Sequence, residues 1–343
     1  MPDVFHDLQF PNGCRCSNGS PGLTRRACLL AALPLAAPGP SEAQSAYPNR
    51  PITLIVPFAP GGIADITART VAQAMAVSLK QAVIVDNRPS AGSITGSAAV
   101  AQAAPDGYTL LLMSNANAVS ASLFKKLSFD VTQDFAPVTT LGFFDLALFV
   151  DNVSRFNTLA DVLTHAKAQP GKLTIGTISV GSTQHLSAEL FKTRTGIDAV
   201  IVPYKGTPAV LAALRAHEID LGFEILGPIL PQLEAKVLRA LAVTSDKRFP
   251  ALPQVPTVQK AGVPNYAVSS WNALAAPAKT PPDIVARLNA AVLEAMNSAD
   301  VQQRLKSLGV RPQSSTPEQL RSLLAAEIKR WGEVIRAAKI ETQ

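Results

Sequence analysis

Two loops rich in glycine and serine hold the residues of this chain with the clearest chemical potential. Residues 58–62 (FAPGG) follow the apolar run 52–57, and residues 179–182 (SVGS) follow the apolar run 173–178, each before a predicted helix. The first backbone N–H groups of a helix lack intrahelical partners and lie at the positive end of the helix dipole. Each loop therefore predicts a cradle for an anion, and its repetition in both halves of the chain predicts a cleft between two cradles.

The sequence lacks the residue patterns of a catalytic or metal-binding centre. It contains no G-x-S-x-G nucleophile elbow, no GxGxxG dinucleotide fingerprint and no Walker phosphate loop. Its histidines do not pair at the spacing of metal ligands, and no two carboxylates stand out as an acid–base couple. The histidines are His6, His165, His185 and His217. We therefore predict a protein that is not an enzyme and holds neither a metal nor an organic cofactor.

Residues 1–43 have the pattern of an export signal. An arginine pair at 25–26 precedes a short apolar stretch, and residues 41–43 (SEA) place small side chains where a signal peptidase reads. We expect cleavage near Ala43 or Ala46. The residues after the arginine pair match the twin-arginine consensus only loosely, so Sec export to the periplasm is the main expectation and twin-arginine export the alternative.

Composition sets further limits on the class of protein. The chain is 47% hydrophobic and 16% charged, as in globular proteins with a large core, and its 343 residues are enough for two domains. Its cysteines, Cys14, Cys16 and Cys28, all precede residue 44, so the rest of the chain forms neither a disulfide nor a thiolate site.

The net charge of the chain is +6, does not change on removal of residues 1–43 and attracts anions weakly. No basic run with interleaved aromatic residues indicates nucleic-acid binding, and no later segment is apolar for long enough to cross a membrane.

Apolar segments alternate with helical segments through both halves of the chain. This alternation predicts an α/β fold of two doubly wound lobes, each with a parallel sheet covered on both faces. Apolar segments at 145–150 and 267–275 are predicted to cross between the lobes as hinge strands. We expect residues 44–146 and 269–343 in lobe 1 and residues 147–268 in lobe 2. Other predicted strands lie at 52–57, 82–85, 108–112, 172–178, 199–202, 219–223 and 238–243.

Three predicted helices have recognisable start signals. Thr158, followed three residues later by Asp161, predicts a capped helix that ends at residues 170–171. Thr280 and Thr316 each stand before a proline, the usual arrangement of an N-cap and a first helical residue. Apolar residues between 320 and 335 keep helical spacing on one face, so we expect the last helix to pack against lobe 1.

Several ordered motifs resemble a known family of receptors. They are residues 47–52 (YPNRPI), 57–62 (PFAPGG) with Asp65, 86–89 (DNRP), 104–111 (APDGYTLL), 202–206 (VPYKG) and 238–245 (LRALAVTS). This pattern resembles the Bug receptor family, the periplasmic solute-binding components of tripartite tricarboxylate transporters, over residues 47–343. The resemblance implies a type II periplasmic-binding-protein fold without catalysis. It also implies a small organic carboxylate held between the lobes, largely by backbone amides and water.

The resemblance implies ligand-contacting residues in both lobes. In lobe 1 these are Phe58, Ala59, Pro60, Gly61, Gly62, Ile63, Asp65, Ser90, Ala91, Gly92, Ser114 and Asn115. In lobe 2 they are Ser179, Gly181, Ser182, Thr183, His185, Tyr204, Lys205, Gly206, Phe223 and Glu224. The chain departs from the family pattern near this set. Pro208 comes one residue earlier than is usual, Glu224 replaces a frequent aspartate, and residues 225–227 are less polar.

Four residues of this set also have a structural interpretation. Asp65 is expected either to contact the ligand or only to stabilise the N-terminus of its helix. His185 contacts the ligand or packs within its helical turn, and Lys205 pairs with a ligand carboxylate or extends into solvent. If Glu224 faces the cleft as a carboxylate, it repels a second ligand carboxylate, which predicts a monocarboxylate or amino acid in preference to citrate.

The function implied by the resemblance is that of an exported receptor, expected to be monomeric, that delivers its ligand to membrane permease subunits. Two alternatives come from other classes of protein. One is a receptor whose ligand-bound form signals to a sensor protein, and the other is a periplasmic enzyme that acts on a small acid. Turnover of a bound acid would identify the enzyme, and neighbouring permease genes would separate transport from sensing.

Overall fold

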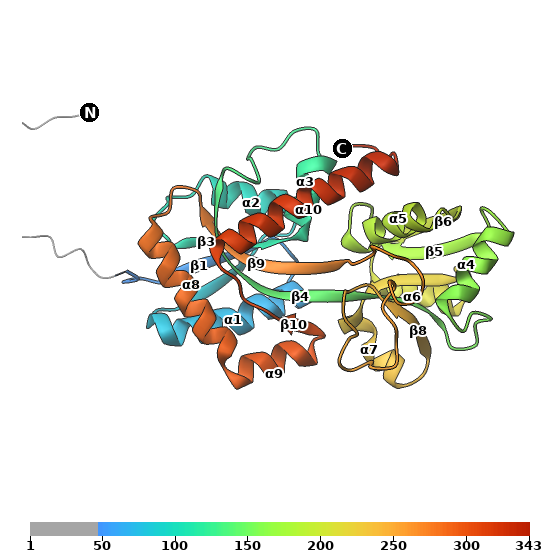
Figure 1. Cartoon of the computed structure of the whole chain (residues 1–343). Helices are drawn as coiled ribbons and strands as arrows, with labels where there is room; N and C mark the ends of the chain where they lie inside the picture. The colour runs from blue at the N-terminus through green and yellow to red at the C-terminus, as the bar shows by residue number, and fades with distance from the viewer. Residues whose placement is uncertain (1–46) are drawn as a thin grey trace, which may run out of the picture. The chain divides into compact units, whose positions relative to one another are not determined.

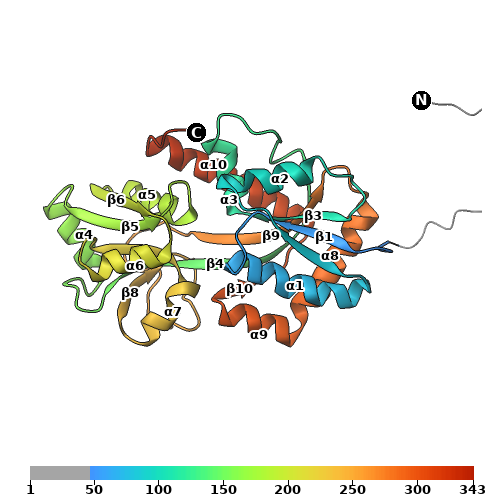
Figure 2. The ribbon, with the colours of Figure 1, turned by 180° about the vertical axis from the view of Figure 1, so that it is seen from behind.

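Two α/β lobes joined by two long strands make up the described part of the chain. The computed structural model describes residues 47–343, so the predicted export signal with its three cysteines and both cleavage positions lies outside the described residues. The connecting strands are β4 (Phe135–Asp151) and β9 (Ser269–Pro277), which run side by side between the lobes in both views (Figures 1 and 2). The predicted fold class, two doubly wound lobes with two hinge strands, is confirmed.

Lobe 1 combines segments from both ends of the described chain. Its strands β2, β1 and β3 are parallel, and β9, β4 and β10 extend the sheet in antiparallel orientation. Alternate residues of β3 point to opposite faces of the lobe 1 sheet. Leu110 and Leu112 pack with α1 and α8 on one face, whereas Leu111 and Met113 belong to the core beneath α10 on the other. The elements are β1 (Ile52–Val56), α1 (Ile63–Leu79), β2 (Val83–Asn87), η1 (Ala91–Ser93), α2 (Ile94–Ala101), β3 (Thr109–Ser114), α3 (Asn115–Leu123), α8 (Pro282–Asn297), α9 (Ala299–Ser307), β10 (Val310–Pro312) and α10 (Pro317–Ala337).

Lobe 2 is formed by the continuous stretch of chain between the two hinge strands. Its strands β7, β5 and β6 are parallel, and both β7 and β8 pair with the second half of β4 in antiparallel orientation. The elements are α4 (Leu159–Ala168), β5 (Leu173–Ile178), α5 (Thr183–Thr195), β6 (Ala199–Tyr204), α6 (Thr207–Arg215), β7 (Leu221–Ile225), α7 (Leu226–Glu234) and β8 (Leu238–Val243).

The middle of β4 is the point at which the two sheets meet. Its pairing with β9 ends at Asp145, and its pairing with β7 begins at the next residue, Leu146, opposite Ile225. Ser114, at the carboxyl end of β3, lies opposite Asn272 near the lobe 2 end of β9. Both sets of parallel strands therefore direct their carboxyl ends toward the junction. The loops after these strands are the ones in which the sequence places the ligand site.

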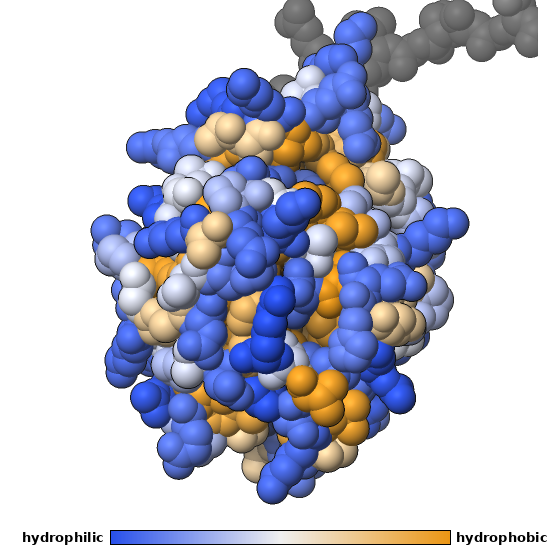
Figure 3. Space-filling model, turned by 90° about the vertical axis from the view of Figure 1, so that its right-hand side faces the viewer, coloured by the Kyte–Doolittle hydropathy of each residue, from blue (hydrophilic) through white to orange (hydrophobic). Residues whose placement is uncertain are grey.

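Three apolar clusters hold this architecture together. The largest runs from lobe 1 through the hinge into lobe 2 and includes Trp271 of β9, Trp331 of α10 and Phe223 of β7. A second lies between the lobe 1 sheet and helices α1 and α8, and a third lies beneath α6 and α7. The outer surface of lobe 2 is mostly hydrophilic with separate hydrophobic patches (Figure 3). Shared burial across the hinge explains why the last helix is an integral part of the core.

Helix starts agree with two of the three predicted caps. Thr158 with Asp161, and Thr316 with Gln319, each form a reciprocal capping box. The prediction for Thr280 is wrong, because α8 begins at Pro282 and its N-cap is Pro281, with no side-chain cap. Pro281 is extended, with ψ 141°, since a residue that precedes a proline avoids the helical region. The first hinge strand also begins ten residues before the predicted crossing, at Phe135.

Candidate functional site

The loop between β1 and α1 presents an uncapped helix N-terminus. Gly62 is the N-cap of α1, and no side chain caps the first turn. Gly61 has φ +81°, a left-handed conformation that glycine adopts without strain. Residues 59–62 are exposed, whereas Ile63 is half-buried. The first amides of α1 are therefore available to an anion from solvent.

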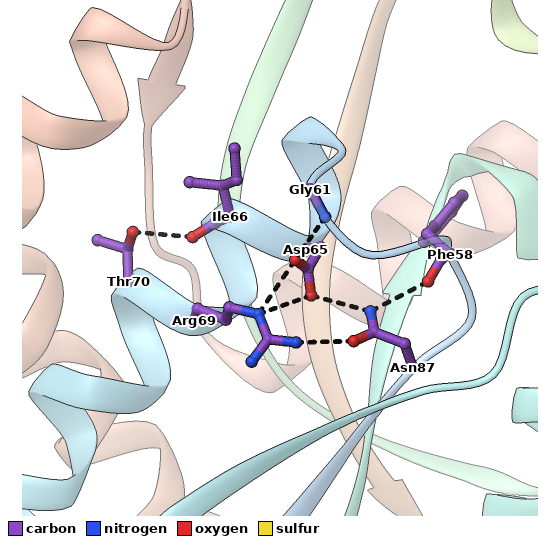
Figure 4. Close-up of polar contacts among 7 residues, drawn as sticks. All are labelled: Phe58, Gly61, Asp65, Ile66, Arg69, Thr70 and Asn87. Carbon is purple, nitrogen blue, oxygen red and sulfur yellow. Dashed lines mark hydrogen bonds and ion pairs between the residues drawn. The ribbon is translucent and has the colours of Figure 1, made fainter.

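A buried carboxylate fixes the shape of this loop from below (Figure 4). The Asp65 side chain accepts hydrogen bonds from the Gly61 N–H at 2.9 Å, Arg69 Nε at 3.0 Å and Asn87 Nδ2 at 2.8 Å. Asn87 Nδ2 also donates to the Phe58 carbonyl at 3.0 Å, so one amide group ties both ends of the loop to β2. Arg69 completes the network by donating to Asn87 Oδ1 at 2.7 Å.

The same network decides the charge of Asp65. Burial alone raises the pKa of this carboxyl, but the hydrogen bonds from Arg69, Gly61 and Asn87 outweigh burial and hold the pKa below its usual value. Asp65 is only 2% exposed, and both of its oxygens are engaged by the protein. This geometry favours the structural interpretation of Asp65, namely support of the loop, and direct ligand contact stays a prediction.

Two further lobe 1 loops end near the junction. Gly92 has φ +61°, and a Cβ there would lie 2.5 Å from the Phe124 ring, so this turn requires glycine. Ser90 Oγ accepts from the Thr95 N–H, which fixes the loop that also contains Ala91. Ser114 is the N-cap of α3 and forms a capping box with Asn117. These contacts account for the backbone geometry of both predicted segments.

The corresponding lobe 2 loop contacts lobe 1 directly. A Cβ on Gly181, which has φ +80°, would lie 2.5 Å from Leu123 Cδ2 at the end of α3. Ser182 caps α5 by accepting from the His185 N–H at 3.1 Å. The next residue, Thr183, accepts from Asn115 Nδ2 at 2.8 Å. Ser179 is exposed and donates its N–H to the Tyr204 carbonyl at 2.9 Å, which links this loop to the end of β6.

His185 is a buried, neutral imidazole. Burial, with a smaller contribution from Lys192, lowers the pKa of His185 to about 4. The side chain is 6% exposed and its Nδ1 has no hydrogen-bond partner in the described structure. Thr177, near the end of β5, is fully buried and its hydroxyl also has no partner. The sequence reasoning did not single out Thr177, which lies two residues before the loop 179–182.

Glu224 lies beneath the N-terminus of α6. Its carboxylate is 1% exposed and accepts from Gln184 Nε2, from Thr207 Oγ1 at 2.7 Å and from the Ile225 N–H at 2.7 Å. Burial raises the pKa of Glu224 despite these three hydrogen bonds. Gly206, the N-cap of α6, provides no side-chain cap, and Lys205 beside it is exposed. The carboxylate of Glu224 thus faces protein donors.

Phe223 differs from the other predicted contacts. It is fully buried, and its ring lies 5.8 Å from that of Phe191, so it belongs to the core of lobe 2.

A second contact between the lobes, which sequence reasoning missed, is made by backbone atoms. Gly227 in the first turn of α7 packs against the Leu308 carbonyl and Gly309 in the turn after α9. Ile63 of α1 also approaches Gly227, so the α1 and α7 N-termini are neighbours.

The candidate site is therefore defined by these loops. Recesses of about 260 to 650 Å³ elsewhere on the described part of the chain are lined by other residues. Within residues 47–343 no cluster of His, Cys, Asp and Glu could hold a metal ion. No helix in that range has both the length and the apolar character needed to cross a membrane.

Comparison with known proteins gives a consistent picture. Residues 67–340 match the model of the tripartite tricarboxylate transporter family receptor. Protein BugT of Bordetella pertussis is 38% identical over 292 residues, which cover 84% of this chain and 90% of BugT. A UPF0065 protein from the tcbD-tcbE intergenic region of Pseudomonas sp. strain P51 is 37% identical, over 84% of this chain and 87% of its own length.

Solved structures show the same similarity in three dimensions. A structure described as a periplasmic transporter has a TM-score of 0.76 and 35% identity, covering 87% of this chain and all of that one. An R. palustris protein solved with adipate has a TM-score of 0.75 and 34% identity, covering 86% of this chain and 99% of that one. MatC from Rhodopseudomonas palustris, with bound malate, has a TM-score of 0.72 and 33% identity. The match covers 84% of this chain and 100% of MatC.

Proposed function

Because the chain belongs to the tripartite tricarboxylate transporter receptor family, we propose that it is a periplasmic solute-binding receptor that captures a small organic carboxylate. In this proposal the ligand binds between lobe 1, residues 44–146 with 269–343, and lobe 2, residues 147–268. The loaded receptor then delivers the ligand to the permease subunits of a membrane transporter. The receptor acts as a monomer, reaches the periplasm through its cleaved signal and performs no catalysis.

The observation that carries this proposal is that an uncapped helix N-terminus in each lobe follows a strand whose carboxyl end points toward the junction. The α5 N-terminus, the cradle predicted in lobe 2, is instead capped by Ser182. Gly62 of α1 and Gly206 of α6 supply no side-chain cap, so their first amides can donate to a ligand. Each N-terminus contributes about half a positive charge, and two together roughly balance one carboxylate. Such a site recognises the carboxylate group without arginine or lysine, as backbone amides do in other anion sites.

The internal network around the first cradle supports the same interpretation. Asp65 accepts the Gly61 N–H, so the amides that follow Gly62 are the ones left for a ligand. Arg69 balances the charge of Asp65, which reduces the repulsion between this carboxylate and a bound anion. We infer that Asp65, Arg69 and Asn87 position the cradle and do not bind the ligand themselves.

A ligand screen tests the proposed function. Adipate, malate, citrate and a series of monocarboxylates are added to the protein, and the unfolding temperature is measured before calorimetry on the hits. A ligand at about 100 times its Kd stabilises the folded state by about 2.7 kcal/mol, so binding gives a clear shift. Small-angle scattering with the bound acid should show a smaller radius of gyration if the lobes close. Binding of no small carboxylate, or turnover of a bound acid, would contradict the proposal.

A further inference from the structure

A buried acid of lobe 2 lies where three helices begin. Glu224 is 1% exposed and stands next to the last residue of β7. Its Oε1 atom accepts hydrogen bonds from Gln184 Nε2 and from the Ile225 N–H, the latter at 2.7 Å. Its Oε2 atom accepts from Thr207 Oγ1 at 2.7 Å. Both carboxyl oxygens are therefore engaged by donors of the protein.

The three donors come from the starts of three different helices. Gln184 is the second residue of α5, Thr207 is the first residue of α6, and Ile225 is the N-cap of α7. A buried polar group that loses its partner costs free energy, so each helix start is held where it meets the carboxyl group. One side chain thus fixes the N-termini of α5, α6 and α7 relative to one another.

The turn that leads into α6 is anchored by Glu224. In the described part of the chain, the hydrogen bond from Thr207 is the only one that a side chain of residues 205–208 makes. Lys205 and Pro208 are exposed, and Gly206 provides no side-chain cap. The position of this turn therefore depends on the one hydrogen bond between Thr207 and the buried acid.

The N-termini of α5 and α7 also contact lobe 1. Thr183, directly before Gln184, accepts from Asn115 Nδ2 at 2.8 Å. Gly227, in the first turn of α7, packs against the Leu308 carbonyl. Through α5 and α7, the buried carboxyl group relates the α6 N-terminus to both of these contacts between the lobes.

The contacts of Glu224 do not require a charged carboxylate. Burial raises the pKa of Glu224, and its three partners are an amide, a hydroxyl and a backbone N–H. When Oε2 is protonated, it donates to Thr207 Oγ1 while Oε1 still accepts from its two donors. A glutamine at this position offers the same pair of groups, a donor and an acceptor, whereas a leucine offers neither.

From these contacts we propose that Glu224 is a positioning residue of the lobe 2 half of the ligand site. It fixes the α6 N-terminus relative to α5 and α7, so that the first amides of α6 keep one position when a ligand approaches. The inference rests on the proposed function, in which those amides donate to the ligand carboxylate. Glu224 acts through the start of α6 and does not contact the ligand.

Hydrogen exchange of the full chain, measured by mass spectrometry without ligand, tests the positioning role. Thr207→Val keeps the volume of the side chain but removes the donor, so the amides of residues 207–215 should exchange at least about fivefold faster than in the wild type. Residues 159–168, which form α4, are the internal reference and should not change. Thr193→Val, which removes a hydroxyl from an exposed position of α5, is the matched control.

Conservative variants separate a positioning role from a general loss of stability. Thr207→Ser keeps the hydroxyl, and Glu224→Gln keeps a donor and an acceptor, so these should recover the slow exchange that is lost in Thr207→Val and Glu224→Leu. The variant that combines Glu224→Leu with Thr207→Val should exchange like Glu224→Leu alone, because the hydroxyl acts through the carboxyl group. Circular dichroism melting of each variant verifies that it is folded.

Calorimetry with butanoate measures the effect on binding. Thr207→Val should bind butanoate at least about fivefold more weakly than the wild type, because the first amides of α6 no longer keep one position. Thr207→Ser should recover the lost affinity. A monocarboxylate is the suitable probe, since it has no second charge for Glu224 to repel.

The proposal is overturned if residues 207–215 exchange as slowly in folded Thr207→Val as in the wild type, or if Thr207→Ser loses as much protection as Thr207→Val. It is also overturned if the effects of Glu224→Leu and Thr207→Val on exchange add, or if Thr207→Val exchanges faster and still binds butanoate with wild-type affinity. Failure of the wild type to bind any small carboxylate would instead contradict the proposed function. The exchange measurement would still decide whether Glu224 fixes the start of α6.

Discussion

Asn115 Nδ2 donates to Thr183 Oγ1 at 2.8 Å and thereby joins the first turn of α3 in lobe 1 to the first turn of α5 in lobe 2. Trp331 of α10 fixes the other end of the Asn115 side chain by donating to its Oδ1 at 2.8 Å. Thr183 also donates to Ser270 of the second hinge strand at 3.3 Å. The four residues form one chain of hydrogen bonds that crosses the junction between the lobes, with Trp331, Asn115 and Thr183 buried and Ser270 half-buried.

Removal of the Thr183 hydroxyl should therefore loosen the junction. Thr183→Val keeps the volume of the side chain but leaves the Asn115 amide without its acceptor, which costs about 1–3 kcal/mol in the free energy of unfolding. Urea denaturation measures this loss. Thr193→Val, on an exposed position of the same helix, is the control and should change the stability by less than about 0.5 kcal/mol. Equal stabilities of the two variants would contradict the assigned role of Thr183.

Gly62→Val should remove carboxylate binding while the fold is kept. Gly62 has φ −75° and ψ 165°, which any residue adopts, and a Cβ there meets only the Ala59 carbonyl at an ordinary 3.6 Å. A β-branched side chain beside the first amides of α1 obstructs an approaching anion, so we expect at least about tenfold weaker binding in calorimetry. A well-folded variant with wild-type affinity would remove this loop from the proposed site.

Gly227→Ala should push the lobes apart. A Cβ at Gly227 collides with the Leu308 carbonyl oxygen, which is backbone and cannot rotate away. We expect a larger radius of gyration in small-angle scattering and weaker carboxylate binding than in the wild type. Gly62→Ala, whose added Cβ has an ordinary contact, should leave the radius of gyration unchanged. A wild-type scattering profile for Gly227→Ala would show that this contact does not set the distance between the lobes.

His185 should make the folded state sensitive to acid. The pKa of His185 is about 4 in the folded protein, whereas the ordinary value for a histidine is 6.5. Between these pH values the unfolded chain therefore binds more protons than the folded chain. Stability is therefore lost as pH falls from 6.5 to 4, by about 3 kcal/mol for this group. Urea titrations at both ends of that window should show a smaller loss for His185→Gln than for the wild type. His217→Asn, at an exposed position, should lose as much as the wild type.

Glu224→Gln tests the predicted selectivity against a second carboxylate. Two unit charges about 4 Å apart repel by about 4 kcal/mol at an effective dielectric near 20, and the repulsion is smaller at longer distance. In the structure the Glu224 carboxylate is buried and accepts from Gln184, Thr207 and the Ile225 N–H, so it acts on a ligand only through repulsion at longer distance. We expect the wild type to prefer monocarboxylates or amino acids over citrate in the carboxylate site, and Glu224→Gln to bind dicarboxylates more tightly, by less than the contact value. Glu218→Gln, at an exposed position, is the control. If the wild type, Glu224→Gln and Glu218→Gln all bound citrate equally tightly, Glu224 would not be the residue that selects against a second carboxylate.

Sequence patterns predicted the local elements well because these depend on neighbouring residues. The period of apolar residues located β1 and β5 within one residue, and the Thr158 and Thr316 caps follow from side chains three positions apart. Thr280 failed because the conformation of Pro281 is controlled by the proline that follows it. The start of β4 at Phe135 was missed because its pairing partners come from β9, more than a hundred residues later.

In the candidate site too, some features could be predicted from the sequence and others could not. The glycine-rich loops were visible in the sequence, since left-handed turns at Gly61 and Gly181 need a particular residue type. The partners that support them were not visible. Asn87 reaches Phe58 and Asp65 from the next strand, and Gly227 meets Leu308 across the two lobes. Such contacts depend on the packing of whole elements, which no short pattern encodes.

The interleaved connectivity of lobe 1 has a consequence for the order in which the chain can fold. Lobe 2 uses one uninterrupted stretch of chain, so its parallel sheet can form as soon as β5 to β8 have been synthesised. Lobe 1 must wait for β9 and for α10, whose Trp331 is fully buried in the shared core. A nascent chain that has not yet released its last helix therefore contains all the strands of lobe 2 but lacks the helix that completes lobe 1. During that interval, the face of β3 that carries Leu111 and Met113 lacks its α10 cover.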